Sequence, residues 1–195
     1  MTSLNPASPL VLDTRELGRR PGSMRRLQRT VKAPADLGTE VISVRAGSDL
    51  ELEARLEAVM EGVLVTGTTR AQAKGECVRC LDDVEQDLEV EFQELFVYPE
   101  KKFDGRPRAD AEEAEPDEYL LQDDLVDLEA VVRDAVVLAL PFQPVCREDC
   151  PGLCPQCGVH MSEDPEHMHD SVDPRWAALQ SLVVEQDTLP GQKES

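Results

Sequence analysis

The clearest hydrophobic pattern in the chain is an alternation with a period of two. Small or apolar residues alternate with charged ones over residues 50–58, and the alternation returns over residues 84–92. A period of two places the apolar side chains on one face of a strand and the charged side chains on the other. The residue types of 50–58 favour a helix by propensity, but their period predicts a half-buried strand.

Three further segments predict strands because they are rich in β-branched or apolar residues. They are residues 11–17, 41–44 and 63–73. The segment at 63–73 is followed directly by the one at 84–92, with Cys77 and Cys80 between them. Two strands joined in this way predict a hairpin, so we expect both cysteines at or near its tip.

A helical period begins after residue 123. The apolar positions at helical spacing are Leu125, Leu128, Val132, Val136 and Ala139. Asp123 or Asp124 can cap the helix, and Pro141 ends it. The pattern predicts a helix to about Leu140 that packs on the sheet. A second helix is predicted from Asp173-Pro174, with Trp176, Leu179 and Val183 on one side.

Together these elements predict an α+β fold: an antiparallel sheet, with a barrel-like form as a variant, a packed helix and a C-terminal zinc-knuckle module. We expect an α+β domain over residues 1–141, in which the acidic segment 99–117 is a disordered loop. A cysteine-rich metal knuckle and the closing helix would occupy residues 142–187. The last residues, 188–195, would form a disordered tail.

The charge of the chain is strongly negative and unevenly distributed. Lys and Arg number 20 against 40 Asp and Glu, a formal charge of −20, so the surface as a whole repels nucleic acid and anionic membranes. Residues 19–32 are the exception, with six basic residues and no acidic one. These are Arg19, Arg20, Arg25, Arg26, Arg29 and Lys32. The segment is suited to contact a polyanion such as RNA, or is a solvated loop with ordinary surface arginines.

The chain shows no pattern for export or membrane insertion. The first 18 residues lack an apolar segment of the signal-peptide type, and no run of 18 apolar residues occurs. We therefore expect a cytoplasmic protein. In that compartment six cysteines are expected to be metal ligands rather than disulfides.

The cysteines fall into two clusters. The first is Cys77-Val-Arg-Cys80, and the second contains Cys146, Cys150, Cys154 and Cys157 within twelve residues. Two thiolates separated by two residues can hold one tetrahedral zinc from a tight turn, and Gly158 after the last cysteine permits a positive φ. The histidines His167 and His169 follow, so the segment predicts zinc binding.

Two groupings of these ligands remain open. In one, Cys146, Cys150, Cys154 and Cys157 form a single site with the histidines nearby. In the other, Cys154 and Cys157 pair either with His167 and His169 or with Cys77 and Cys80 across the fold. Eight candidate ligands suffice for two tetrahedral zinc ions. His160 is expected to be a polar turn residue.

Other chemistry fits the sequence less well. The spacing Cys150-x-x-x-Cys154-x-x-Cys157 matches a radical SAM cluster motif, but it lies too near the C-terminus for the barrel that follows such motifs. A ferredoxin cluster uses other spacings, and a thioredoxin-like Cys77-Cys80 pair would need a βαβ setting. The sequence lacks a Ser-His-Asp pattern, a phosphate-binding glycine loop and a His-Glu-x-x-His helix, so we predict no enzyme. A hydrolase centred on His167 and His169 is the catalytic alternative.

These motifs resemble the YceD family. The similar stretches are Cys77-x-x-Cys80-Leu81 after a threonine-rich strand, Leu138-Ala-Leu-Pro141 leading into the second cysteine cluster, and Asp173-Pro-Arg-Trp-Ala-Ala-Leu179. The string Gly152-Leu-Cys154-Pro-Gln-Cys157-Gly158 is the most specific. Many cysteine-rich members carry Cys-x-Cys where this chain has His167-Met168-His169, and zinc accepts either ligand type.

The resemblance implies a role in the accumulation, processing or stability of large-subunit ribosomal RNA. The expected partners are that RNA, through residues 19–32, or a basic ribosomal protein held by the acidic surface. In the second case the chain would be an adaptor or chaperone without RNA contact. Neither a membrane nor a small-molecule substrate is expected.

Overall fold

The computed structural model describes residues 4–35, 37–100, 118–169 and 175. The chain divides into two compact units, Met1–Cys150 and Pro151–Ser195, and each is considered by itself. Three expected features lie outside the described residues: the helix from Asp173, most of the acidic loop 99–117 and the tail 188–195. Within the described residues, no helix is long and apolar enough to cross a membrane.

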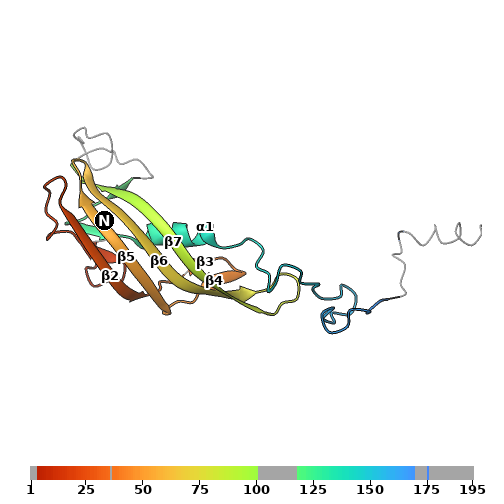
Figure 1. Cartoon of the computed structure of the whole chain (residues 1–195). Helices are drawn as coiled ribbons and strands as arrows, with labels where there is room; N and C mark the ends of the chain where they lie inside the picture. The colour runs from red at the N-terminus through yellow and green to blue at the C-terminus, as the bar shows by residue number, and fades with distance from the viewer. Residues whose placement is uncertain (1–3, 36, 101–117, 170–174, 176–195) are drawn as a thin grey trace, which may run out of the picture. The chain divides into compact units, whose positions relative to one another are not determined.

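Three long antiparallel strands form the centre of the first unit (Figure 1). They are β5 (Asp49–Ala58), β6 (Gly62–Glu76) and β7 (Asp83–Val97). One edge of β6 pairs with β7 along its whole length, and the other edge pairs first with β5 and further along with β4 (Ile42–Val44). The predicted strands at 50–58, 63–73 and 84–92 are confirmed, and the last two are longer than expected.

The basic segment contains a strand that its sequence pattern did not predict. Strand β2 (Met24–Lys32) pairs with β5 over nine residue pairs. Its side chains alternate between exposed and half-buried, with Leu27 and Val31 packed against the core. The expectation of a solvated loop was therefore wrong over these residues. Arginines interrupt the apolar positions of the strand, and this hid the period of two.

The sheet does not close into a barrel, which corrects the barrel-like expectation. In the described residues β2 pairs only with β5, and beyond β4 the sheet ends at β3 (Leu37–Gly38). On the far side β8 (Tyr119–Leu120) adds a short parallel pair to β7. A separate two-stranded sheet joins β1 (Val11–Asp13) to β9 (Leu125–Asp127), so the strand predicted over 11–17 ends early.

The helix α1 (Glu129–Ala139) begins later than predicted. Asp123 and Asp124 do not cap it: their φ angles are 53° and 60°, and strand β9 follows them. The turn is held from β1, because the backbone N–H and the hydroxyl of Thr14 both donate to the Asp124 carbonyl. Ala139 is exposed, so it does not belong to the buried face predicted for this helix.

One face of the sheet is buried and the other is charged. The apolar residues of β5 are all buried, as its period of two predicts, and α1 covers this face beside β7. Gly67 lies opposite Phe92 in the register, and a Cβ there would be 2.5 Å from the Phe92 ring. The absence of a side chain at Gly67 therefore lets the Phe92 ring lie across strand β6. On the opposite face, cross-strand ion pairs such as Arg70 with Glu53 and Glu89 connect neighbouring strands.

Candidate metal centres

The first candidate site is built on the tip of the β6–β7 hairpin. After β6 the chain turns so that the Cys77 N–H donates to the Asp82 carbonyl at 2.8 Å, and the Leu81 N–H donates to the Cys77 carbonyl at 2.8 Å. Leu81 takes a left-handed conformation, with φ 64°. This turn brings the Cys77 and Cys80 side chains together, as predicted for a hairpin tip.

The segment after α1 docks on this tip through hydrogen bonds that the tip donates to backbone carbonyls of that segment. The Val78 N–H donates to the Pro144 carbonyl at 2.9 Å, and the Arg79 guanidinium donates to the carbonyls of Glu148 and Cys150 at 3.2 and 3.0 Å. The sequence pattern gave no signal for Arg79. It lies between the two hairpin cysteines and holds the other half of the site in place.

Docking brings four sulfurs into one cluster, called the four-cysteine site. The Cys77 and Cys150 Sγ atoms are 3.8 Å apart, those of Cys80 and Cys146 are 3.6 Å apart, and all four lie within 4.8 Å of one another. A disulfide needs sulfurs about 2.0 Å apart. Zn–S bonds of about 2.3 Å place tetrahedral sulfurs about 3.8 Å apart. The geometry therefore fits a tetrahedral metal ion.

The surroundings of the four-cysteine site favour the thiolate at Cys77, whereas the pKa values of Cys80 and Cys146 are raised. Burial opposes ionisation of Cys77, but backbone N–H groups, first that of Cys146 and then those of Cys80 and Arg79, lower its pKa to about 6. The Asp82 N–H also favours a Cys80 thiolate, but burial, the hydrogen bond that the Cys80 thiol donates to the Asp82 carboxylate and the hydrogen bonds with neighbouring thiols raise the Cys80 pKa overall. Three of the four cysteines are buried, which is typical of a closed structural site.

The second candidate site lies in the second unit and repeats the same turn. The Gly158 N–H donates to the Cys154 carbonyl at 2.9 Å, and the Cys154 N–H donates to the Val159 carbonyl at 2.8 Å. Gly158 occupies the left-handed position, with φ 74°, in place of Leu81 in the first turn. The pKa of Cys154 is lowered to about 6, chiefly by the N–H groups of Gln156 and Cys157.

Two histidines complete the second cluster, called the Cys₂His₂ site. The Cys157 Sγ lies 3.2 Å from the Nε2 atoms of both His167 and His169, which are 2.8 Å from each other. A tetrahedral zinc would place the nitrogens about 3.3 Å apart, so metal entry needs a movement of about half an ångström. Asp164 Oδ2 lies 3.7 Å from His167 Nδ1, beyond hydrogen-bond distance but at the ring nitrogen through which a carboxylate would orient a histidine that ligates through Nε2.

The structure separates the eight candidate ligands into two groups of four. Cys154 and Cys157 join His167 and His169, which is one of the groupings left open by the sequence. The hairpin pair Cys77 and Cys80 joins Cys146 and Cys150, a combination that spacing did not indicate. The grouping of the four C-terminal cysteines in one site is not the arrangement found. His160 lies outside both groups, in a bridge with Leu153.

Most of the predicted RNA-binding residues are engaged by the protein itself. Arg19 pairs with Glu100 and Asp124, Arg25 with Glu16, and Lys32 with Asp49; the Arg29 guanidinium donates to the Val11 carbonyl. Within the described part of the chain, the side chains of Arg20 and Arg26 make no hydrogen bond or ion pair. Arg20 precedes β2 and Arg26 lies within it, so only two of the six basic side chains are unpaired among the described residues, and the segment is not a free polycation.

The structure combines an open, mainly antiparallel sheet with two four-ligand clusters, one of four cysteines and one of two cysteines and two histidines. These features define a class of protein: a small α+β protein with candidate structural metal sites. The chain belongs to the family described as large ribosomal RNA subunit accumulation protein YceD, whose model matches residues 65–183. This range includes all eight candidate ligands.

Relatives extend this similarity beyond the matched range. An uncharacterized protein of Mycobacterium tuberculosis is 49% identical over 189 residues, which cover 96% of this chain and 88% of the relative. An uncharacterized protein of Mycobacterium leprae is 42% identical over 91% of this chain and 79% of its own. The uncharacterized protein YlbN of Bacillus subtilis is 26% identical over 74% of this chain and 80% of its own. No solved structure matches the chain.

Proposed function

We propose that this protein is a non-catalytic, zinc-stabilised cytoplasmic factor in the accumulation of large-subunit ribosomal RNA, acting in its synthesis, processing or stability. Membership of the YceD family, whose name states that role, carries the proposal. The resemblance noted in the sequence leads to the same role.

Zinc is the metal best suited to both clusters. Thiolate and imidazole ligands in tetrahedral groups are those that zinc prefers, and four protein ligands leave no open position for a reacting water. In the four-cysteine site the ion would connect the hairpin tip to the segment after α1; in the Cys₂His₂ site it would hold together a segment with little apolar content. Both roles are structural, which supports a protein that binds rather than catalyses.

The experiment for the ribosomal role is crosslinking in living cells followed by purification of the protein and sequencing of attached RNA. Enrichment of a defined region of large-subunit ribosomal RNA is the expected result. Background RNA alone, with no change in large-subunit RNA levels on deletion of the gene, would contradict the proposal.

A second candidate is an adaptor or chaperone for a basic ribosomal protein, without RNA contact. It is favoured by the formal charge of −20 and by the internal pairing of most basic side chains in residues 19–32. Charge complementarity of this kind speeds encounter with a basic partner. Recovery of a basic ribosomal protein without ribosomal RNA, from the same crosslinked cells, is its distinguishing result.

A further inference from the structure

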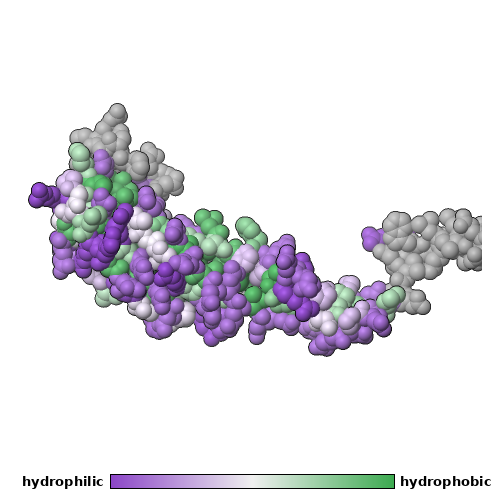
Figure 2. Space-filling view, in the orientation of Figure 1, coloured by the Kyte–Doolittle hydropathy of each residue, from purple (hydrophilic) through white to green (hydrophobic). Residues whose placement is uncertain are grey.

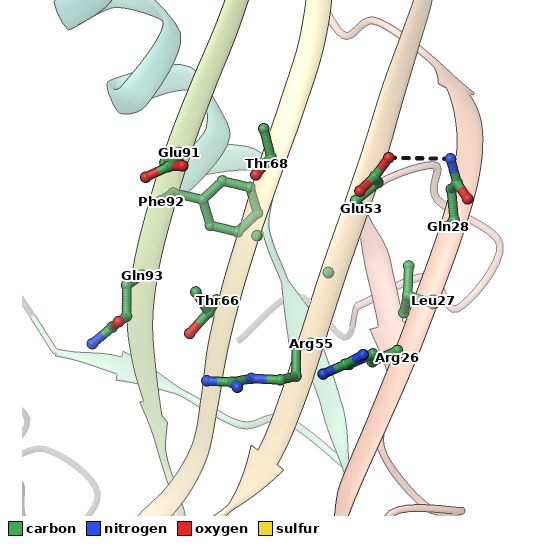
Figure 3. A pocket seen from close by; sticks show the side chains of 12 residues that line it. Arg26, Leu27, Gln28, Glu53, Arg55, Thr66, Thr68, Glu91, Phe92 and Gln93 are labelled. Atoms are coloured by element: carbon green, nitrogen blue, oxygen red, sulfur yellow. Dashed lines mark hydrogen bonds between the residues drawn. The ribbon is translucent and has the colours of Figure 1, made fainter.

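The charged face of the sheet carries a hollow of about 850 Å³ that neither metal site uses. It lies over β2, β5, β6 and β7, on the side chains shown in Figure 3. Arg26 and Arg55 are side by side at one end of the hollow, with Thr66 and Gln93 next to them. The space-filling view shows that hydrophilic side chains cover much of the sheet region in this orientation (Figure 2).

The strand register explains why these four side chains are neighbours. Arg26 of β2 lies opposite Arg55 of β5, Arg55 lies opposite Thr66 of β6, and Thr66 lies opposite Gln93 of β7. They therefore form one row across four strands, spaced by about 4.8 Å from strand to strand. The row presents two guanidinium groups, a hydroxyl and a carboxamide, all of which can donate hydrogen bonds.

Arg26 and Arg55 are a like-charged pair on this face, as are Glu76 and Asp83 beside the hairpin tip. Like charges directly opposite each other destabilise a sheet. Most other charged pairs on the same face join opposite charges across strands: Lys32 with Asp49, Lys74 with Glu85, and Arg70 with Glu53 and Glu89. By contrast, Arg26 pairs with no carboxylate of the described residues, and the one ion pair found there for Arg55 is a long contact of 3.9 Å to Glu57.

We infer that Arg26 and Arg55 form a binding site for a single phosphate group, with Thr66 and Gln93 as additional donors. Two guanidiniums from directly opposite positions on adjacent strands match the charge and the several acceptor oxygens of a phosphate better than the single charge of a carboxylate. The bound anion would remove the repulsion between the two arginines.

The carboxylates of the hollow lie at the end away from the two arginines (Figure 3). Glu53 is occupied by Gln28 and Arg70. Glu91 has no ion pair with the described residues, so its charge opposes an anion at its own end and leaves the arginine end as the favourable place. The inference does not depend on the proposed ribosomal role, since either a free phosphate or the backbone phosphate of a nucleic acid provides this chemistry.

The test is titration calorimetry of the full-length, zinc-loaded protein with inorganic phosphate, and separately with a short single-stranded RNA that lacks terminal phosphates. Arg26→Gln and Arg55→Gln should each weaken phosphate binding by about tenfold or more, because each removes a charged hydrogen-bond donor. Arg20→Gln is the matched control, since Arg20 is also unpaired among the described residues but does not line the hollow. It should bind phosphate like the wild type.

Thermal melting gives a second readout that a merely structural role would not produce. Without ligand, Arg26→Gln and Arg55→Gln should melt no lower than the wild type, because they remove the repulsion. Phosphate should raise the melting temperature of the wild type and of Arg20→Gln, but not of the two hollow variants.

The two titrants separate the sources of the phosphate. Binding of phosphate without RNA supports a site for a free phosphate or monoester, and binding of both, weakened by the same two variants, supports contact with an RNA backbone. The inference is overturned if neither titrant binds, if Arg20→Gln weakens binding as much as the hollow variants, or if RNA alone binds and is unaffected by them. Failure of the ribosomal proposal would instead appear only in the crosslinking experiment.

Discussion

Removing one ligand of the four-cysteine site should destabilise the first unit by an amount set by chain connectivity. The proposed metal joins Cys80 to Cys146, which are 66 residues apart, and Cys77 to Cys150, which are 73 apart. A cross-link that closes a loop of this length lowers the entropy of the unfolded chain by an amount worth about 4 kcal/mol at 25 °C. For a unit of this size, that corresponds to a melting temperature lower by roughly 8–16 °C.

The perturbation is Cys146→Ser, chosen because Cys146 is the exposed member of the site and its replacement leaves no buried cavity. Wild type and variant would be purified with zinc, their metal content measured by mass spectrometry, and their unfolding followed by far-ultraviolet circular dichroism, which reports the sheet. Chelated wild type should melt close to the zinc-loaded variant, because both lack the cross-link.

Cys157→Ser is the matched control. It removes a ligand of the Cys₂His₂ site, where Cys157 and His167 are only 10 residues apart within the second unit. The variant should lose metal without lowering the melting of the sheet. If Cys146→Ser melts within about a degree of the zinc-loaded wild type, the four-cysteine site does not act as a metal cross-link. If the variant melts far below the chelated wild type, packing rather than metal explains the loss.

Three further predictions follow from single contacts. Thr69→Val should lower the free energy of unfolding by about 1 kcal/mol in urea titration, because the buried hydroxyl donates to the Glu51 carbonyl at 3.1 Å; an unchanged midpoint would contradict this role. Leu128→Ala, at a fully buried position preceding α1, should cost about 2–5 kcal/mol in the same assay, whereas Leu138→Ala at an exposed position should have little effect. In the metal-free protein, the thiolate absorbance lost in Cys154→Ser should titrate with a midpoint near pH 6, and a midpoint near 8.5 would refute the lowered pKa. Since that pKa lies below its usual value, the stability contributed by Cys154 should be complete above about pH 8.5 and be lost as the pH falls through 6.

Local patterns in the sequence were sufficient for the central hairpins. The alternation over residues 50–58 and 84–92 predicted strands with the correct buried face, because a strand's two faces depend only on a period of two. The placement of Cys77 and Cys80 at a hairpin tip followed from the same strands. The turn Cys154-x-x-Cys157-Gly158 could also be predicted from the sequence, since its hydrogen bonds and its left-handed residue lie within a few positions of one another.

Helix start and ligand grouping depended on long-range contacts. Asp123 and Asp124 are residue types that commonly cap a helix. However, Thr14, which is 110 residues from Asp124, donates a hydrogen bond to the Asp124 carbonyl, and the residues that follow pair with β1 as a strand. Cys146 and Cys150 lie close to Cys154 and Cys157 in sequence, yet they join the hairpin. Spacing defines which cysteines can share a turn, whereas only the docking of two distant segments decides which turns share a metal.

The charged face of the sheet shows most clearly which properties follow from the sequence and which from the tertiary structure. The sequence by itself determined that residues 19–32 are basic within an acidic chain, because charge is a property of composition. Only the tertiary structure decided that Arg19, Arg25 and Lys32 meet carboxylates while Arg26 meets Arg55. The physical reason is that an ion pair depends on distances of a few ångströms, and the strand register sets those distances between residues far apart along the chain.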